Sequence, residues 1–140
     1  MSIVQGQTTS FKYQLFQGTQ NFTTDTFYMA LYNGNANLNL TTTAYSSTNE
    51  ITGTGYTAGG KALTGVTLNY DATNSVVYVN FDGLTWNPAN FTTRCALIYN
   101  SSRANTSVAV IDFGADKSCT NTFTVTMPGN TYSTALIRSA

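Results

Sequence analysis

The segment Gly55–Ala62, GYTAGGKA, has the glycine and lysine spacing of a phosphate-binding loop, with Lys61 in the expected place. In such loops backbone amides and the lysine hold phosphates, and the next residue is Ser or Thr because its hydroxyl binds Mg²⁺. Here Ala62 follows and offers no oxygen. The apolar segment Ser107–Asp112, SVAVID, resembles the metal-binding strand of the same enzymes. The neighbouring elements must decide between a nucleotide site and another use for the glycines.

A phosphate loop must lead into a helix, whose N-terminal amides meet the phosphates. The residues after Lys61, ALTGVTLNY, contain Gly65 and several β-branched side chains, and they predict a strand. The sequence therefore argues against a nucleotide site. We interpret the glycines as structural positions that need positive φ or a close backbone approach; they are Gly53, Gly55, Gly59 and Gly60.

Other catalytic and metal-binding patterns are weak. The chain has no histidine, which removes Ser-His-Asp triads and histidine-based zinc sites. Asp112 and Asp116 are close in sequence, but they flank a predicted turn and are expected to cap it. A calcium site at Asp71 and Asn74 is an alternative, although the acidic spacing of calcium loops is missing. We expect no catalytic residue, no metal and no cofactor, so the protein is not expected to be an enzyme.

Composition limits the partners. The 140 residues are 9% charged, with six basic and six acidic side chains scattered singly, so no basic patch is expected to attract nucleic acid. No apolar run is long enough to span a membrane, and MSIVQGQTTS lacks the features of a secretory signal. Cys95 and Cys119 are expected to be free thiols in a reducing compartment, with a single bridge between them as the alternative.

Abundant Thr, Val, Tyr and Phe predict an all-β chain: an antiparallel β-sandwich or jelly roll with one short N-terminal helix. We expect residues 1–9 to form an extended arm and residues 10–140 to form a single sandwich domain. Ser10 is expected to cap a helix that Gly18 closes.

Period-two patterns assign the faces of the strands. In TFYMALY, Phe27, Met29 and Leu31 share one face. In TFTVTM, Phe123, Val125 and Met127 are expected inside and the threonines outside. In VVYVNF, Val77, Val79 and Phe81 are expected inside. In RCALIY, Cys95, Leu97 and Tyr99 share one face.

Several aromatic and apolar side chains are candidates for protein contacts. Trp86, beside Pro88 and Phe91, is interpreted as a core or interface anchor, with sugar stacking as the alternative. Tyr45 is expected to face outward, where aromatic side chains favour protein contacts. Phe11, Leu15 and Phe16 precede the sandwich and are expected to contact another subunit or a partner protein.

The order of motifs resembles a family of small tailed-phage virion proteins, associated with capsid decoration (cement) proteins. The resemblance extends from about residue 10 to the C-terminus. Its most specific motif is TNEITGTGYTAGG, residues 48–60, and ALIYN, residues 96–100, supports it. SFKYQLFQG, FTTDTFYMALY and SVAVIDFG complete the pattern.

The resemblance implies a non-enzymatic protein, made in the host bacterial cytoplasm, that binds the major capsid protein on the outer capsid surface. It also implies a homo-oligomer, a trimer, with no nucleic-acid or membrane partner. The alternative is a tail-associated module for host recognition or carbohydrate binding. Decoration proteins are present in hundreds of copies per particle and tail proteins in a few, so copy number separates the two functions.

Overall fold

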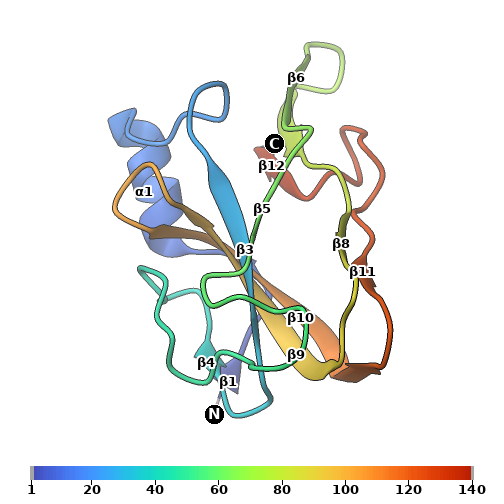
Figure 1. Cartoon of the computed structure of the whole chain (residues 1–140). Helices are drawn as coiled ribbons and strands as arrows, with labels where there is room; N and C mark the ends of the chain where they lie inside the picture. The colour runs from blue at the N-terminus through green and yellow to red at the C-terminus, as the bar shows by residue number, and fades with distance from the viewer. Residues whose placement is uncertain (1, 140) are drawn as a thin grey trace.

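The computed structural model describes residues 2–139 and confirms the predicted all-β, sandwich-like fold with one short N-terminal helix (Figure 1). Its centre is a five-stranded antiparallel sheet with the order β2-β10-β9-β3-β5. The strands of this sheet are β2 (Gly6–Gln7), β3 (Phe27–Tyr32), β5 (Lys61–Ala62), β9 (Phe91–Asn100) and β10 (Thr106–Cys119). The long β9–β10 hairpin crosses the middle of the molecule and supports the other elements (Figure 1).

Three smaller sheets surround this centre. β1 (Ser2–Ile3) pairs in parallel with β4 (Asn37–Leu38), inside the long polar segment that follows β3. β8 (Leu84–Trp86) pairs with β11 (Phe123–Val125). The third sheet has the order β12-β7-β6, and its strands are β6 (Thr67–Asp71), β7 (Val76–Asn80) and β12 (Ile137–Ser139).

Helix α1 (Thr9–Gln17) begins two residues earlier than the expected cap at Ser10 implies. Thr8, and not Ser10, is the N-cap: its side chain accepts a hydrogen bond from the amide of Phe11 at 3.4 Å. The helix ends at Gly18 as predicted, because Gly18 adopts the left-handed conformation with φ 74°. Thr8 is fixed by tertiary contacts: it is fully buried, and its amide donates a hydrogen bond to the carbonyl of Val108 on the neighbouring β10 at 3.0 Å.

The expected extended arm, residues 1–9, is extended over residues 2–7 but is paired with the rest of the molecule. β2 forms one edge of the large sheet, and Thr8 is fully buried. Met1 lies outside the described residues. Removing residues 1–9 would therefore delete an edge strand and the helix cap, so this segment is part of the fold and not a free arm.

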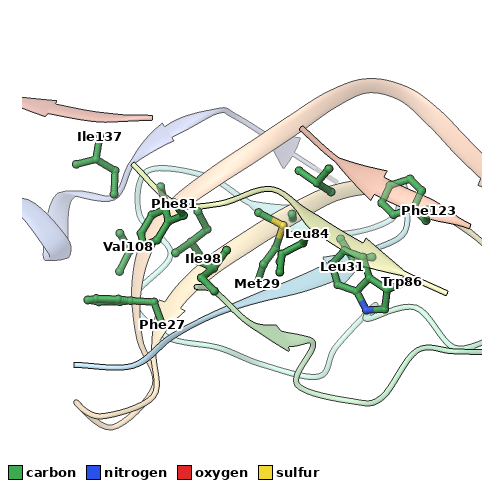
Figure 2. Packing of buried hydrophobic residues seen from close by; sticks show 14 of the residues in the cluster. Phe27, Met29, Leu31, Phe81, Leu84, Trp86, Ile98, Val108, Phe123 and Ile137 are labelled. Carbon is green, nitrogen blue, oxygen red and sulfur yellow. The ribbon is translucent and has the colours of Figure 1, made fainter. Parts of the chain in front are cut away.

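The large sheet is buried on both faces. On one face, Phe27, Met29 and Leu31 of β3 pack into the main core (Figure 2). That core also contains Phe11 from α1, and Phe81, Leu84, Trp86 and Phe123 from the smaller sheets and their connections. On the other face a second core is covered by the segment after β3; it contains Ala30, Tyr32, Leu38, Cys95, Leu97, Tyr99 and Val110. The predicted alternation of β3 and β9 is confirmed, and both faces prove to be buried.

One face assignment is wrong. Val79 and Phe81 are buried as expected, but Val77 is exposed. Val77 lies opposite Tyr70 near the tip of the β6–β7 hairpin, beyond the reach of the main core. Its neighbour Val76 is buried instead. The hairpin therefore carries an apolar side chain at its surface.

We predict that Phe123→Ala lowers the free energy of unfolding by roughly 3–5 kcal/mol, because it leaves a cavity in the main core. The Phe123 ring lies 5.4 Å from that of Phe91 and 6.0 Å from that of Trp86, centroid to centroid. Thr124→Ala is the matched control, since Thr124 is the exposed neighbour on the same strand. Denaturant unfolding of both variants measures the difference. Equal losses would contradict the assignment of β11.

Candidate functional site

The phosphate-loop pattern does not form a phosphate site. Lys61 lies in β5 and is followed by strand and loop, so no helix N-terminus faces it. Its ammonium group donates a hydrogen bond to the carbonyl of Thr85 and lies 5.7 Å from the ring centroid of Trp86. Lys61 thus joins β5 to β8 across the edge of the sandwich.

The four glycines singled out in the sequence have positive φ: 152°, 87°, 95° and 85° for Gly53, Gly55, Gly59 and Gly60. At Gly53, Gly55 and Gly60 the backbone of another segment lies too close for a Cβ atom, and the approach is closest at Gly55 and Gly60. A Cβ atom on Gly55 would lie 1.7 Å from the Pro88 carbonyl oxygen, and one on Gly60 would lie 1.9 Å from the Met29 carbonyl oxygen. Only glycine fits there, because both the conformation and the space exclude a side chain.

Glu50, the only glutamate of the chain, organises this segment. One carboxylate oxygen accepts a hydrogen bond from the hydroxyl of Tyr45 at 2.6 Å. The other accepts from the hydroxyl of Tyr56 and from the amide of Gly59, the latter at 2.8 Å. Tyr56 in turn accepts from the amide of Leu31 in β3 at 2.9 Å. We call these residues, with Tyr99, the Glu50 cluster.

Burial and the Glu50 charge raise the tyrosine pKa values in and beside this cluster. Burial is the larger cause for Tyr99, whose pKa is raised to about 12, and the negative charge of Glu50 adds to it. For Tyr45 and Tyr56, burial and then the hydrogen bond to Glu50 raise the pKa well above its usual value. Nearby Tyr32 is shifted in the same direction, chiefly by burial. These phenols therefore remain protonated and act as donors, which is the role a partly buried carboxylate requires.

The Glu50 cluster holds the loop rather than presenting a reactive group. Both carboxylate oxygens already accept hydrogen bonds. The hydroxyl of Tyr99 donates to the carbonyl of Gly59 at 2.6 Å, and its ring stacks on Tyr45 with centroids 4.8 Å apart. The motif TNEITGTGYTAGG is thus a segment that one carboxylate and several phenols fasten to the large sheet.

The turn predicted between Asp112 and Asp116 is absent: both residues lie within β10, whose pairing with β9 shifts register between Asp112 and Lys117. Asp71 and Asp112 are engaged by the fold itself. Asp71 caps its turn by accepting from the amide of Asn74 at 2.9 Å, and this bond lowers its pKa. Asp112 pairs with Arg94 at 3.3 Å and accepts from the amide of Gly114 at 2.8 Å. No group of three or more potential metal-ligating side chains gathers within residues 2–139.

Asp25 and the two cysteines are also structural. Burial opposes ionisation of Asp25, but hydrogen bonds from Arg103 and Asn100 outweigh it and lower its pKa. Cys95 and Cys119 are free thiols, as expected. Burial raises the pKa of the Cys95 thiol to about 12, so Cys95 packs as an apolar side chain.

Two of the predicted contact residues are corrected. Phe11 is fully buried in the main core, where its ring meets Phe22 edge-on, and Trp86 is only 3% exposed. Both side chains point into the main core, so neither is available to a partner or a sugar. Tyr45 is half-buried against Tyr99 and contributes only part of its ring to the surface.

Leu15 and Phe16 remain exposed, and Phe16 is 94% exposed. Tyr13 joins them on the outer side of α1 and was missed in the sequence, although it lies three residues from Phe16 and so shares its side of a helix. We call Tyr13, Leu15 and Phe16 the helix surface. A second exposed apolar surface is formed by Leu68, Tyr70 and Val77 on the β6–β7 hairpin, and it was also missed. The alternation in VVYVNF predicts that Val77 points inward.

Comparison of the chain with protein-family models, with curated proteins and with solved structures finds no match. None of the helices formed by residues 2–139 has the length and apolar character needed to cross a membrane. The function must therefore be argued from the surfaces and clusters described above.

We predict that Gly60→Ala destabilises the protein far more than Gly18→Ala. Both residues have positive φ, so each substitution costs about 1–2 kcal/mol of backbone strain. A Cβ on Gly18 meets nothing within 4 Å, whereas one on Gly60 would overlap the Met29 carbonyl. Displacing that backbone should add a further ~1–3 kcal/mol. Thermal unfolding of the pair tests the close approach; a similar loss in both variants would refute it.

We predict that stability falls as the pH rises above about 10. An unfolded tyrosine ionises near pH 10, whereas Tyr99 in the fold holds its proton to about pH 12. The unfolded state therefore binds fewer protons in this window, and each such tyrosine lowers the free energy of unfolding by up to about 1.4 kcal/mol per pH unit. Denaturant unfolding between pH 8 and 12 measures the slope. Tyr99→Phe should make it shallower, and an unchanged slope would contradict the assignment.

Proposed function

We propose that the protein is a non-enzymatic structural component of a phage virion, a decoration protein that binds the major capsid protein on the outer face of the shell. Two lines of support combine in this proposal. The motif order resembles that of small virion proteins, above all in TNEITGTGYTAGG. The helix surface also offers apolar side chains to a partner.

The exposure of Phe16 carries the proposal. A phenylalanine that is 94% exposed loses the stabilisation it would gain from burial, about 1.5–3 kcal/mol. Here it lies on a helix that is capped at both ends and anchored by Phe11 in the main core. A rigidly presented apolar side chain of this kind suits a protein interface, because little conformational freedom is lost on binding.

The polar side chains also fit a structural role. The carboxylates of Glu50, Asp25 and Asp112 each accept hydrogen bonds from the fold itself. A decoration protein needs this kind of internal bonding and no reactive group. Zero net charge and scattered charges suit the outside of a shell, away from packaged DNA.

We further propose that the protein forms a homo-oligomer, a trimer on the shell, after synthesis in the host bacterial cytoplasm. Only 9% of the residues are charged, which is low for a monomer that must remain soluble, and burial between subunits would relieve this. Free Cys95 and Cys119 are compatible with a reducing compartment.

We predict that Phe16→Ser weakens binding to particles assembled without the protein by at least about tenfold, as expected for loss of an aromatic anchor. Tyr132→Ser is the matched control, because it removes a partly exposed aromatic side chain from a different segment. Co-sedimentation with the particles measures binding, and thermal unfolding verifies that both variants fold.

Densitometry of purified virions tests the location independently. Hundreds of copies per particle are expected of a shell protein. A dozen copies or fewer would favour the alternative, a tail-associated module for host recognition or carbohydrate binding. Equal binding by the Phe16 and Tyr132 variants would remove the helix surface from the proposal.

A further inference from the structure

A groove of about 580 Å³ lies between β10 and β11. Its walls are mainly apolar, and Lys117 is the only charged side chain that lines it. Lys117 is exposed and forms no ion pair with any residue that the structure describes. The apolar walls are formed by Ile111, Phe113, Phe123, Val125, Met127 and Leu136. The groove thus combines an apolar interior with one positive charge at its border.

The groove is open because two strands leave an edge unpaired beside it. β2 pairs with β10 only at Ala109 and Val110, so that edge of β10 has no strand partner beyond them among the described residues. The side chain of Gln5 accepts a hydrogen bond from the amide of Asp112 at 3.0 Å. Among the described residues, this is the last hydrogen bond between the N-terminal segment and that edge of β10. On the other side, β11 has β8 as its only described strand partner. An extended segment could therefore lie between them.

The β6–β7 hairpin has the complementary character. It extends from the body of the molecule at the top of Figure 1. Tyr70 is 81% exposed and lies directly opposite the exposed Val77, and Leu68, two residues before Tyr70, shares their face. Asp71 follows at the end of β6 and is partly exposed. β6 has no described partner on its outer edge. The hairpin is an apolar projection with one negative charge.

We infer that the β6–β7 hairpin of one copy of this chain occupies the β10–β11 groove of a second copy, with Tyr70 as the apolar anchor and Asp71 facing Lys117. This rests on the proposed homo-oligomer and specifies its contact. None of residues 67–80 lines the groove within one chain, so the complementarity is not used inside the monomer. The contact is heterologous, because different surfaces meet, and a rotation that closes it produces a ring such as the proposed trimer.

Charge complementarity favours a second copy as the occupant. With only six basic and six acidic residues in the chain, a single charge on each surface is a specific feature, and the two are opposite. A large aromatic side chain entering an apolar pocket is the usual anchor of a protein interface. Asp71 is held in place by the amide and side chain of Asn74, so its position on the hairpin is fixed.

Analytical ultracentrifugation over a range of concentrations tests the contact. Tyr70→Ser should weaken self-association by roughly thirtyfold or more, as for loss of an anchor side chain. Lys117→Asp and Asp71→Lys should each weaken it, and the double variant with both changes should recover it. Tyr13→Ser and Lys12→Asp remove an aromatic ring and reverse a charge on α1, and they should leave self-association unchanged.

The charge exchange keeps the test decisive even though Asp71 also caps its turn. A damaged turn would persist in the double variant, so recovery can come only from the restored pair. A wild-type protein that stays monomeric, self-association unaffected by Tyr70→Ser, or absence of recovery would each overturn the inference. Stoichiometric binding of dodecanoate to a monomer, lost in Lys117→Asp, would overturn it too, since a small apolar acid would then be the occupant.

The outcomes for assembly and for capsid binding are separable. An oligomer that depends on Tyr70 but does not bind particles would support this contact and contradict the proposed function. A monomer that binds particles through Phe16 would support the proposed capsid binding, contradict the proposed homo-oligomer and overturn this contact.

Discussion

The structure depends on the partly buried carboxylate of Glu50. It joins the segment after β3, through Tyr45, to the glycine segment, through Tyr56 and Gly59, and Tyr56 extends the connection to β3. A carboxylate removed from water is tolerated only when donors surround it. The glycines serve the same segment: the amide of Gly59 is one of the donors to Glu50, while Gly55 and Gly60 lie directly against the backbone of Pro88 and Met29.

Fastening this segment also allows the large sheet to be buried on both faces. β3 and β9 are therefore apolar on both sides, and the few polar side chains buried among them are bonded internally. Thr93 donates to the carbonyl of Tyr32 at 3.0 Å, and Asn100 donates to Gln20 Oε1 at 2.8 Å. Such bonds remove the cost of burying polar groups and fix the register of the strands.

Local patterns predicted what depends on neighbouring residues. The alternation of β3 and β11 and the left-handed Gly18 follow from period and backbone preference. Long-range contacts decided the rest. Thr8 replaces Ser10 as the cap because Thr8 is buried and bonded to Val108 of β10, and Trp86 is buried because β11 and Tyr56 cover it. That Gly55 meets Pro88 cannot be inferred from spacing alone.

The division between interior and surface is the strongest argument about function. The hydrogen-bonding groups that could do chemistry are directed into the fold, as in the Glu50 cluster. Apolar side chains are meanwhile displayed on two ordered elements, Phe16 on a capped helix and Tyr70 on a two-stranded hairpin. Side chains held this way lose little entropy when a partner covers them. A neutral, internally bonded fold with two such projections is suited to assembly, with one projection available to another copy and the other to a different protein.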